Sequence, residues 1–369
     1  MNRKAPLNLK VGVDGTWMQG DIRGMGKYAN QLTNPILANL RLFTPADCHF
    51  KILSRLGQSI YPLWEQCILP HLSNVNEIDV LLCPYNTGPT RSLGGTKLIL
   101  VIHDLIYMQD TESLPISTSW YHNLGRFYRR KIVPKTARRA SQIITVSNYS
   151  KLQIIDQLGV DAGRIHIIPN SISEDWFAEP LKLNMRENYF FTVSGDQPSK
   201  NLINLLKGFK SSKLWQTHKL KLKVAGVKQK SIPKFQALCR NLGIFESVCF
   251  FGYLKEEDLR LIYRQSRGFI CASTHEGFGI PIIEAMASGV PVASSNTTAL
   301  PEICGGCAIL FDPRSVNEIK CAITDLYFDM NKNSENLSNG LAHARLFEDK
   351  EIDISIQSFW NNFQILSQK

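Results

Sequence analysis

Two glutamates eight residues apart flank a glycine-rich turn in the second half of the chain. The segment Thr274–Glu284 reads Thr-His-Glu-Gly-Phe-Gly-Ile-Pro-Ile-Ile-Glu. Its glycines let the backbone approach a ligand closely, and its proline suits the first position of a helix. Glu276 and Glu284 each offer a carboxylate that accepts hydrogen bonds from paired hydroxyls. The amides expected to bind phosphate at this helix start are those of Gly277, Phe278, Gly279 and Ile280.

A lysine follows another predicted strand of the same half. The segment Val193–Asn201 reads Val-Ser-Gly-Asp-Gln-Pro-Ser-Lys-Asn, and Lys200 precedes a predicted helix. Ligands of open α/β sheets bind beyond the carboxyl ends of the strands, where this cation would neutralise a diphosphate. Alternatively, Lys200 is an ordinary surface lysine at a helix start. The glutamate turn would likewise be an ordinary strand-to-helix connection, with Glu276 as a solvated or capping acid.

A glycine-rich loop also opens the first predicted helix. Gly24 and Gly26 belong to the run Gly24–Ala29, which formally matches the dinucleotide fingerprint G-x-G-x-x-A. The fingerprint should follow its strand at once, whereas Gly24 lies eleven residues after Val13. The neighbouring Arg23 is a further candidate cation for a diphosphate.

Four more polar or aromatic residues stand at predicted strand ends or junctions. His103 ends a strand and would hydrogen-bond a sugar hydroxyl or stabilise developing positive charge through its carbonyl, unless its role is structural. Asp104 would orient His103 or meet an acceptor, two roles that the sequence does not separate. Asn170 follows Ile-Ile-Pro at a junction and is a ligand contact or a turn residue. Tyr253 lies near a nucleobase or in a core.

Short apolar strands alternate with helical segments along the whole chain, which indicates β-α-β units and parallel sheets. Several strands are apolar without alternation, as expected when both faces are buried. The predicted strands are Leu9–Val13, Phe50–Leu53, Val80–Cys83, Lys97–Ile102, Gln142–Val146, Arg164–Ile168, Tyr189–Val193, Leu220–Ala225, Val248–Phe251, Gly268–Cys271, Pro291–Ala293 and Ala308–Phe311. The predicted helices are Met25–Leu40, Ser147–Leu158, Asn201–Ser211, Ile232–Leu242, Glu256–Gln265, Pro281–Ala287, Val316–Tyr327 and Ile352–Ser367.

With 369 residues the chain is too long for one core, and two domains are expected. The first would cover 1–170 and the second 188–345, with a linker over 171–187. Residues 346–369 would form a C-terminal helix that crosses back to the first domain.

The bulk composition is that of a globular protein, with 44% hydrophobic and 20% charged residues. No apolar run approaches the ~18 residues needed to span a bilayer, and the first ten residues lack a signal-peptide core. We therefore expect a cytoplasmic protein. The nine scattered cysteines do not suggest a disulfide framework, and the lone Cys304-Gly-Gly-Cys307 lacks the further ligands of a metal site.

The glutamate turn resembles the E-x7-E signature of family 4 of the retaining glycosyltransferases. Three other stretches, Val248–Leu259, Ala285–Val292 and Ala299–Glu302, are similar to the same family. In that family the first glutamate lies beside the transferred sugar, and the second holds the ribose hydroxyls. The resemblance implies these roles for Glu276 and Glu284.

The same resemblance implies a fold and a reaction. The fold would be GT-B, with two doubly wound Rossmann-like α/β domains facing a central cleft that binds the donor. The reaction would move a hexose, mannose-type favoured, from a nucleotide-sugar to an acceptor hydroxyl with retention of configuration, in the synthesis of cell-surface polysaccharide or glycolipid. GDP-mannose is the favoured donor and a UDP-sugar the other option. The acceptor would be an oligosaccharide or a lipid-linked sugar.

Further roles also come from the resemblance. His103 and Lys200 would be catalytic with Glu276, and the amides near Gly24 and Gly26 would face the donor diphosphate and the acceptor. The donor is a substrate, so no cofactor is expected. No metal is expected either, because the protein supplies the positive charge and no D-x-D motif occurs.

The sequence leaves three other readings open. The family turn often carries an arginine beside the lysine, whereas this chain has Gly195 and Ser199 there. Lys200 would work alone with the backbone, or Arg23 or another residue would compensate, or the chain is an inactive nucleotide-sugar-binding scaffold. The displaced fingerprint of Gly24–Ala29 supports an NAD-dependent oxidoreductase, and a nucleotide-sugar epimerase would share the architecture.

The formal net charge is +10, and its densest part is the acid-free stretch Asn123–Arg139. Its cations alternate with apolar residues, a composition that suits an anionic membrane surface at the inner face of a cell membrane. A solvated basic helix is the alternative. Nucleic acid is not expected, because no recognised motif accompanies the charge.

Overall fold

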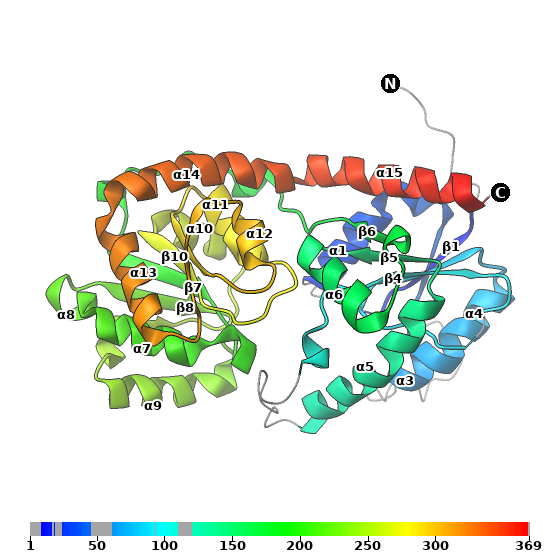
Figure 1. Cartoon of the computed structure of the whole chain (residues 1–369), viewed down its shortest axis with the longest axis horizontal. Helices are drawn as coiled ribbons and strands as arrows, with labels where there is room; N and C mark the ends of the chain where they lie inside the picture. Colours follow the sequence, from blue (N-terminus) through cyan, green and yellow to red (C-terminus); the bar gives the residue numbers. More distant parts are fainter. Residues whose placement is uncertain are drawn as a thin grey trace. The chain divides into compact units, whose positions relative to one another are not determined.

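The computed structural model in Figure 1 divides into two compact units. Among the helices described, none is long and apolar enough to cross a membrane. Unit 1 takes in Met1–Met108, Ser119–Asn170 and Ile352–Lys369, and unit 2 takes in Gln109–Thr118 and Ser171–Glu351. The structure describes residues 9–16, 18, 24–45, 61–91, 93–109 and 120–367.

Unit 1 contains a six-stranded parallel sheet in the order β2-β1-β3-β4-β5-β6. Chain order reverses between β1 and β3, and such a switch point is where open α/β sheets bind ligands. Leu81, Leu100 and Ile143 are fully buried in its core, as apolar strands covered on both faces require. The strands are β1 (Val11–Asp14), β2 (Leu40–Phe43), β3 (Val80–Cys83), β4 (Lys97–Val101), β5 (Gln142–Thr145) and β6 (Ile165–Ile167).

The helices of unit 1 cover this sheet. The C-terminal helix α15 is anchored here by Trp360, which is buried and whose Nε1 donates to the carbonyl of Leu32 at 2.9 Å. The helices are α1 (Met25–Thr33), α3 (Tyr61–Leu63), α4 (Leu69–Val75), α5 (Trp120–Arg139), α6 (Asn148–Leu158) and the part of α15 (Asp349–Ser367) that begins at Ile352; a π-helical turn, Trp64–Ile68, joins α3 to α4.

Unit 2 contains a second six-stranded parallel sheet, in the order β12-β11-β10-β7-β8-β9. This is the dinucleotide-fold order, and its switch point lies between β7 and β10. Phe190, Leu222 and Ile270 lie in its core without exposure. The strands are β7 (Tyr189–Val193), β8 (Lys221–Ala225), β9 (Val248–Phe250), β10 (Gly268–Cys271), β11 (Val292–Ser295) and β12 (Ala308–Phe311).

The helices of unit 2 pack against this sheet and against each other. Helices α7 and α13 lie side by side (Figure 1), and a Cβ on Gly208 would come within 2.4 Å of Ile319 Cγ2, so only glycine permits this approach. The helices are α7 (Leu202–Ser212), α8 (Leu214–Thr217), α9 (Ile232–Leu242), α10 (Glu256–Gln265), α11 (Ile280–Ala287), α12 (Leu300–Cys304), α13 (Val316–Phe328) and α14 (Met330–Ala344). Residues 171–187, predicted as a linker, belong to unit 2, where Trp176 is buried.

The predicted α/β class with two doubly wound sheets is confirmed, and one element is wrong. The helix expected over Met25–Leu40 ends at Thr33, gives way to a 3-10 turn and continues as β2. Pro35 lacks an amide hydrogen and opens that turn, which is why the helix stops. The predicted strand Phe50–Leu53 lies outside the described residues.

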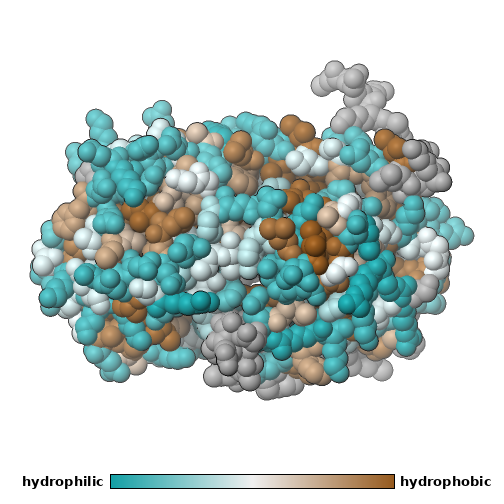
Figure 2. All heavy atoms as spheres, in the orientation of Figure 1, coloured by the Kyte–Doolittle hydropathy of each residue, from teal (hydrophilic) through white to brown (hydrophobic). Residues whose placement is uncertain are grey.

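Hydrophilic residues cover most of the visible face in Figure 2, and hydrophobic residues gather in small groups on each unit. Scattered apolar side chains are normal on a soluble surface. Two of the larger exposed ones lie on α5, where Leu124 is 56% and Phe127 is 55% exposed.

Candidate functional site

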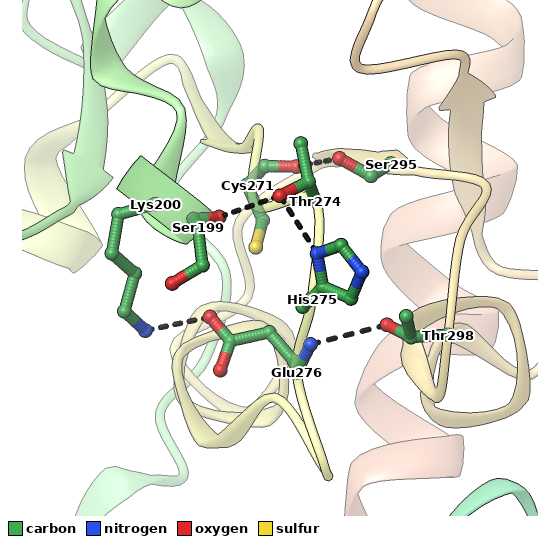
Figure 3. A network of polar contacts seen from close by, with 8 residues as sticks. All are labelled: Ser199, Lys200, Cys271, Thr274, His275, Glu276, Ser295 and Thr298. Atoms are coloured by element: carbon green, nitrogen blue, oxygen red, sulfur yellow. Dashed lines mark hydrogen bonds and ion pairs between the residues drawn. The ribbon is translucent and has the colours of Figure 1, made fainter. Parts of the chain in front are cut away.

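The switch point of unit 2 brings together two charged residues that lie far apart in the sequence. Lys200 follows β7 and Glu276 follows β10, and these strands are neighbours. Lys200 Nζ lies 2.6 Å from Glu276 Oε1 (Figure 3). The two side chains are 30% and 20% exposed, so both charges are partly desolvated. A cation and an acid thus meet where this fold class binds its ligands.

The loop that carries Glu276 is held from both sides (Figure 3). On one side, the Thr274 amide donates to the Ser199 carbonyl at 2.8 Å, and the Thr274 hydroxyl donates to the same carbonyl at 3.3 Å, as Figure 3 shows. These bonds tie the loop to the lysine turn. On the other side, the Thr297 hydroxyl donates to the Thr274 carbonyl at 3.1 Å. The Glu276 amide donates to Thr298 Oγ1 at 3.2 Å, as Figure 3 shows. The backbone at Glu276 is therefore fixed by hydrogen bonds to the segments after β7 and β11.

Thr298 is backbone-strained. Its φ is 58°, in the left-handed region that β-branched residues rarely adopt. Strain of this kind costs about 1–3 kcal/mol and concentrates at functional sites. Here the conformation places the hydroxyl of Thr298 where it accepts from the Glu276 amide.

The start of α11 has the form predicted for a phosphate-binding turn. Its N-cap is Gly279, with φ 122°, which has no side chain to cap the first amides of the helix, and Pro281 lies in the first turn. A Cβ at Gly279 would lie 2.8 Å from Leu300 Cδ2, which reinforces the need for glycine. The Phe278 ring is buried and packs edge-on against Phe347 at 5.6 Å, so this residue offers its amide rather than its side chain.

Glu284 lies on α11 within the same turn-and-helix unit. Gly277 precedes the turn, and Ile280 is the first residue of α11. The Tyr263 hydroxyl, from α10, donates to Glu284 Oε2 at 3.0 Å. Tyr263 was missed by sequence reasoning, as were Thr297 and Thr298, because nothing in an isolated threonine or tyrosine marks a distant partner.

Tyr253 follows β9, at the same carboxyl edge of the sheet but two strands away from β7. It is 67% exposed, so it is not a core residue. An exposed ring at this edge is compatible with contact to a flat ligand group.

His103 follows β4 in unit 1 and is almost fully buried. Its Nε2 lies 3.0 Å from the carbonyl of Pro84, which has only lone pairs, so Nε2 carries the proton and donates. Burial lowers the pKa of His103 to about 4, and the Pro84 hydrogen bond opposes this only in part. The imidazole is therefore neutral at physiological pH, with Nδ1 as its acceptor atom.

Tyr28 connects the predicted first-unit residues. Its ring packs edge-on against His103 at 5.0 Å, and its hydroxyl donates to the Ile168 carbonyl at 2.8 Å, two residues before Asn170. Its amide donates to the Gly24 carbonyl at the start of α1. Gly24 has φ 36°, which favours glycine. Gly26 is buried in the first turn of α1, and Asn170 is also buried.

The two remaining first-unit candidates are Asp104 and Arg23. Asp104 is half-buried and accepts from the Ile106 amide at 3.1 Å. Arg23 lies outside the described residues.

A buried acidic network at the switch point of unit 1 was not foreseen. Asp14 ends β1 and accepts from Trp64 Nε1 at 3.1 Å and from the Tyr61 hydroxyl at 3.2 Å. Glu65 Oε2 accepts from the Tyr128 hydroxyl at 2.5 Å. Burial raises the pKa of both Asp14 and Glu65, and their hydrogen bonds oppose the rise. Within the described part of the chain, no cluster of His, Cys, Asp and Glu forms a potential metal site.

Two family profiles match the chain in tandem. The one described as "Glycosyl transferases group 1" matches residues 174–340, and the one described as "Glycosyltransferase Family 4" matches residues 53–176. The first match contains the whole Lys200–Glu276 site. Together the two profiles span most of the chain.

Two curated relatives that match the chain are named as mannosyltransferases. An O-antigen chain mannosyltransferase B of Escherichia coli is 30% identical over 238 residues, 62% of this chain and 62% of that protein. The O-antigen chain mannosyltransferase RfbU of Salmonella typhimurium is 24% identical over 322 residues, 74% of this chain and 89% of that protein. The match thus spans less than two thirds of the first relative and most of the second.

Solved structures share the fold over nearly the whole chain. Anabaena Alr3699/HepE, solved in complex with UDP and glucose, has a TM-score of 0.73 at 18% identity, over 96% of this chain and 100% of that one. WaaG, a glycosyltransferase involved in lipopolysaccharide biosynthesis, has a TM-score of 0.70 at 16% identity, over 93% of this chain and 99% of that one. The predicted GT-B fold class is confirmed.

Proposed function

Since the chain belongs to the group 1 and family 4 glycosyltransferases, we propose that it transfers a mannosyl group from a nucleotide-sugar donor to an acceptor hydroxyl, with retention of the anomeric configuration. Mannose is favoured because the relatives in Escherichia coli and Salmonella typhimurium are named as mannosyltransferases. The same names support a role in building a cell-surface polysaccharide. GDP-mannose is the favoured donor, and a UDP-sugar is the alternative because HepE was solved with UDP.

The observation that carries this proposal is the Lys200–Glu276 pair at the switch point of unit 2. Lys200 and the amides from Gly277 to Ile280 supply positive charge for a diphosphate, with the glycine-capped start of α11 behind it. Glu284, eight residues after Glu276, receives the ribose hydroxyls. Charge placed in advance for a leaving group is typically the largest catalytic contribution.

The proposed reaction replaces one bond at the anomeric carbon. The bond from that carbon to the diphosphate oxygen breaks, and a bond to the acceptor oxygen forms on the same face. The acceptor proton passes to an oxygen of the departing diphosphate. Lys200 and the helix amides stabilise the charge on the diphosphate, so we expect transfer without a metal ion. Glu276 binds the transferred sugar.

We assign the acceptor to unit 1. Nδ1 of His103 is its acceptor atom because Nε2 donates to Pro84, and it suits a sugar hydroxyl. Gly24 and Gly26 at the start of α1 and Asn170 lie in the neighbourhood that Tyr28 connects to His103. Asp104 is a half-buried carboxylate next to His103 in the chain.

A membrane surface is the proposed location of the acceptor. The exposed face of α5 carries Leu124 and Phe127 followed by Lys131, Lys135 and Arg138. Apolar residues beside cations favour an anionic bilayer surface. A peripheral position at the inner face of a cell membrane would give access to a lipid-linked acceptor.

The alternatives lack comparable support. The oxidoreductase depends on the displaced glycines near Gly24, and the inactive scaffold depends on Gly195 and Ser199. Ser199 is buried, and its carbonyl accepts a hydrogen bond from the Thr274 amide. The residue at this position therefore supports the loop that carries Glu276.

A nucleotide panel tests the proposal. Thermal unfolding of the wild type and of Glu284→Ala is measured with GDP, UDP, ADP and their hexose conjugates. A ligand at 100 times its Kd adds about 2.7 kcal/mol of stability. We expect one nucleotide to raise the unfolding temperature of the wild type and to raise that of Glu284→Ala much less. A transfer assay with the corresponding sugar conjugate should then give a product whose retained anomeric configuration is read by NMR. Absence of any shift in the wild type would overturn the proposal, and a nucleotide shift without any transfer would favour the inactive nucleotide-sugar-binding scaffold.

A further inference from the structure

The carboxylate of Glu284 has a buried partner that the proposed mechanism does not use. Tyr263 lies on α10, which packs against α11, and its hydroxyl donates to Glu284 Oε2 at 3.0 Å. Building on the proposed ribose role of Glu284, we propose that Tyr263 is a positioning residue, whose hydroxyl holds one carboxylate oxygen so that the other meets the ribose diol.

The ring of Tyr263 is held tightly enough for this task. It is fully buried and packs edge-on against Phe191 at 4.8 Å with an interplanar angle of 88°. Trp176 packs edge-on at 5.7 Å, and Phe269 is tilted against it at 5.2 Å. Side chains in a close-packed core keep one rotamer, so the hydroxyl position is set by the core and not by solvent. Glu284 is half-buried, and its hydrogen bond to this fixed hydroxyl holds one of its carboxylate oxygens in place.

The hydroxyl has two acceptors and only one proton. The Pro281 carbonyl lies 3.2 Å away, compared with 3.0 Å for Glu284 Oε2. A bond to an ionised carboxylate is stronger than one to a neutral carbonyl, so the proton points at Glu284. Burial and, next, the charge of Glu284 hold the pKa of Tyr263 well above its usual value, so the phenol remains a donor.

A fixed carboxylate is better at binding a diol than a mobile one. Binding costs less when the receiving side chain is already in its bound rotamer. Removal of the hydroxyl should therefore weaken the ribose contact and leave the diphosphate contacts of Lys200 and the α11 amides unchanged. This difference separates positioning from general structural support.

The chain offers a matched control. Tyr189 is also buried, and its hydroxyl donates to the carbonyl of Ile262, the residue before Tyr263, at 2.7 Å. Tyr189→Phe removes a buried hydroxyl of the same kind from the same helix contact, without touching Glu284. Any loss common to both variants reports on packing around α10.

The experiment compares GDP and UDP with their 2′,3′-dideoxy forms, by calorimetry. In Tyr263→Phe we expect the tighter-binding ribonucleotide to bind roughly tenfold more weakly, an effect of the size of a hydrogen bond to a charged group. The dideoxy form should bind as to the wild type. KM for the sugar conjugate should rise with kcat retained, because the lost contact is made equally in ground and transition states. Tyr189→Phe should change neither ligand.

Glu284→Ala closes the test. In that background Tyr263→Phe should cost no further affinity, because the residue it positions is gone. Equal losses for the ribose and dideoxy forms in Tyr263→Phe, or no loss at all, would overturn the inference while Glu284 keeps its role. If the wild type binds both forms equally, the ribose role of Glu284 fails and the inference with it. A wild type that binds none of these nucleotides overturns the proposed function itself.

Discussion

Glu276 and the proposed donor diphosphate compete for the ammonium group of Lys200. The 2.6 Å ion pair between Lys200 and Glu276 satisfies the ammonium that a diphosphate would need. A doubly charged diphosphate attracts the ammonium more strongly than a single carboxylate does, so it can displace Glu276 from Lys200. The pair therefore holds Lys200 in place without blocking binding.

This pair predicts opposite effects on binding and on transfer. In Glu276→Gln the amide keeps the shape but no longer neutralises Lys200, so nucleoside diphosphate should bind as tightly or a few-fold more tightly. Transfer should fall by about a hundredfold or more, the usual cost of removing a preorganised polar group from a reacting centre. Calorimetry with GDP and UDP and a transfer assay measure the two effects.

Lys200→Gln is the reciprocal control and should weaken diphosphate binding. Weaker binding in Glu276→Gln would contradict the competition and would mean that the carboxylate supports the nucleotide directly. Full transfer activity in the same variant would remove Glu276 from the reaction.

At the scale of elements, the sequence predicted best where local rules decide. Strands such as Val80–Cys83 and Gly268–Cys271 begin and end where predicted, because their apolar runs are bounded by turns. The helix over Met25–Leu40 was overextended past Pro35, and α14 was missed because its first turns, Met330-Asn-Lys-Asn-Ser-Glu-Asn, show little apolar periodicity.

The site follows the same rule. Glycines, a proline and charged residues at strand ends carry their own signal, so the α11 turn, Lys200 and Glu276 could be named in advance. Tyr263 and Asp14 act through partners 21 and 50 residues away, Glu284 and Trp64, which no local pattern reveals. The residues that support a site are therefore the harder part to predict.

The proposed membrane contact of helix α5 can be tested by reversing its exposed charges. Each cation near an anionic bilayer contributes about 1 kcal/mol, so Lys131→Glu, Lys135→Glu and Arg138→Glu together should weaken binding to phosphatidylglycerol vesicles by about a hundredfold or more. Co-sedimentation measures it. Arg126 and Arg130 are left unchanged because both are half-buried and donate to the Tyr107 carbonyl. Arg138 also donates to a backbone carbonyl, that of Leu158 at 3.4 Å, but its side chain is exposed.

The matched control reverses three exposed lysines near α7 in unit 2, with Lys207→Glu, Lys210→Glu and Lys213→Glu. The net charge change is the same. If this control weakens vesicle binding as much as the α5 variant, then overall charge and not α5 is responsible, and the proposed membrane contact is wrong.

At the scale of the whole molecule, two separate cores imply separate stabilities. Two-state unfolding is not expected of such a chain. Acid should act unequally, because the buried groups of unit 1 with shifted pKa values include one histidine and two carboxyls, His103, Asp14 and Glu65.

The signs of these shifts differ. The pKa of His103 is lowered from 6.5 to about 4, so the unfolded chain binds a proton before the folded one, and stability is lost as pH falls from about 6.5 to 4. The pKa values of Asp14 and Glu65 are raised, so their stabilising contribution is present at low pH and is lost as pH rises above the ordinary carboxyl range. The two effects oppose each other in acid.

Comparing the pH dependence of unfolding in the wild type and in His103→Gln isolates the contribution of the histidine. Glutamine keeps an amide that can donate to the Pro84 carbonyl and does not titrate. Between pH 6.5 and 4, unit 1 of the wild type should lose about 3 kcal/mol more unfolding free energy than the variant, at about 1.36 kcal/mol per pKa unit. Hydrogen exchange read by mass spectrometry on peptides of each unit measures this, and unit 2 serves as the internal control. A parallel pH dependence in both proteins would mean that His103 takes up its proton in the folded state at its ordinary pKa. Nε2 would still donate to Pro84, but Nδ1 would be protonated below that pKa and could not accept from a hydroxyl there.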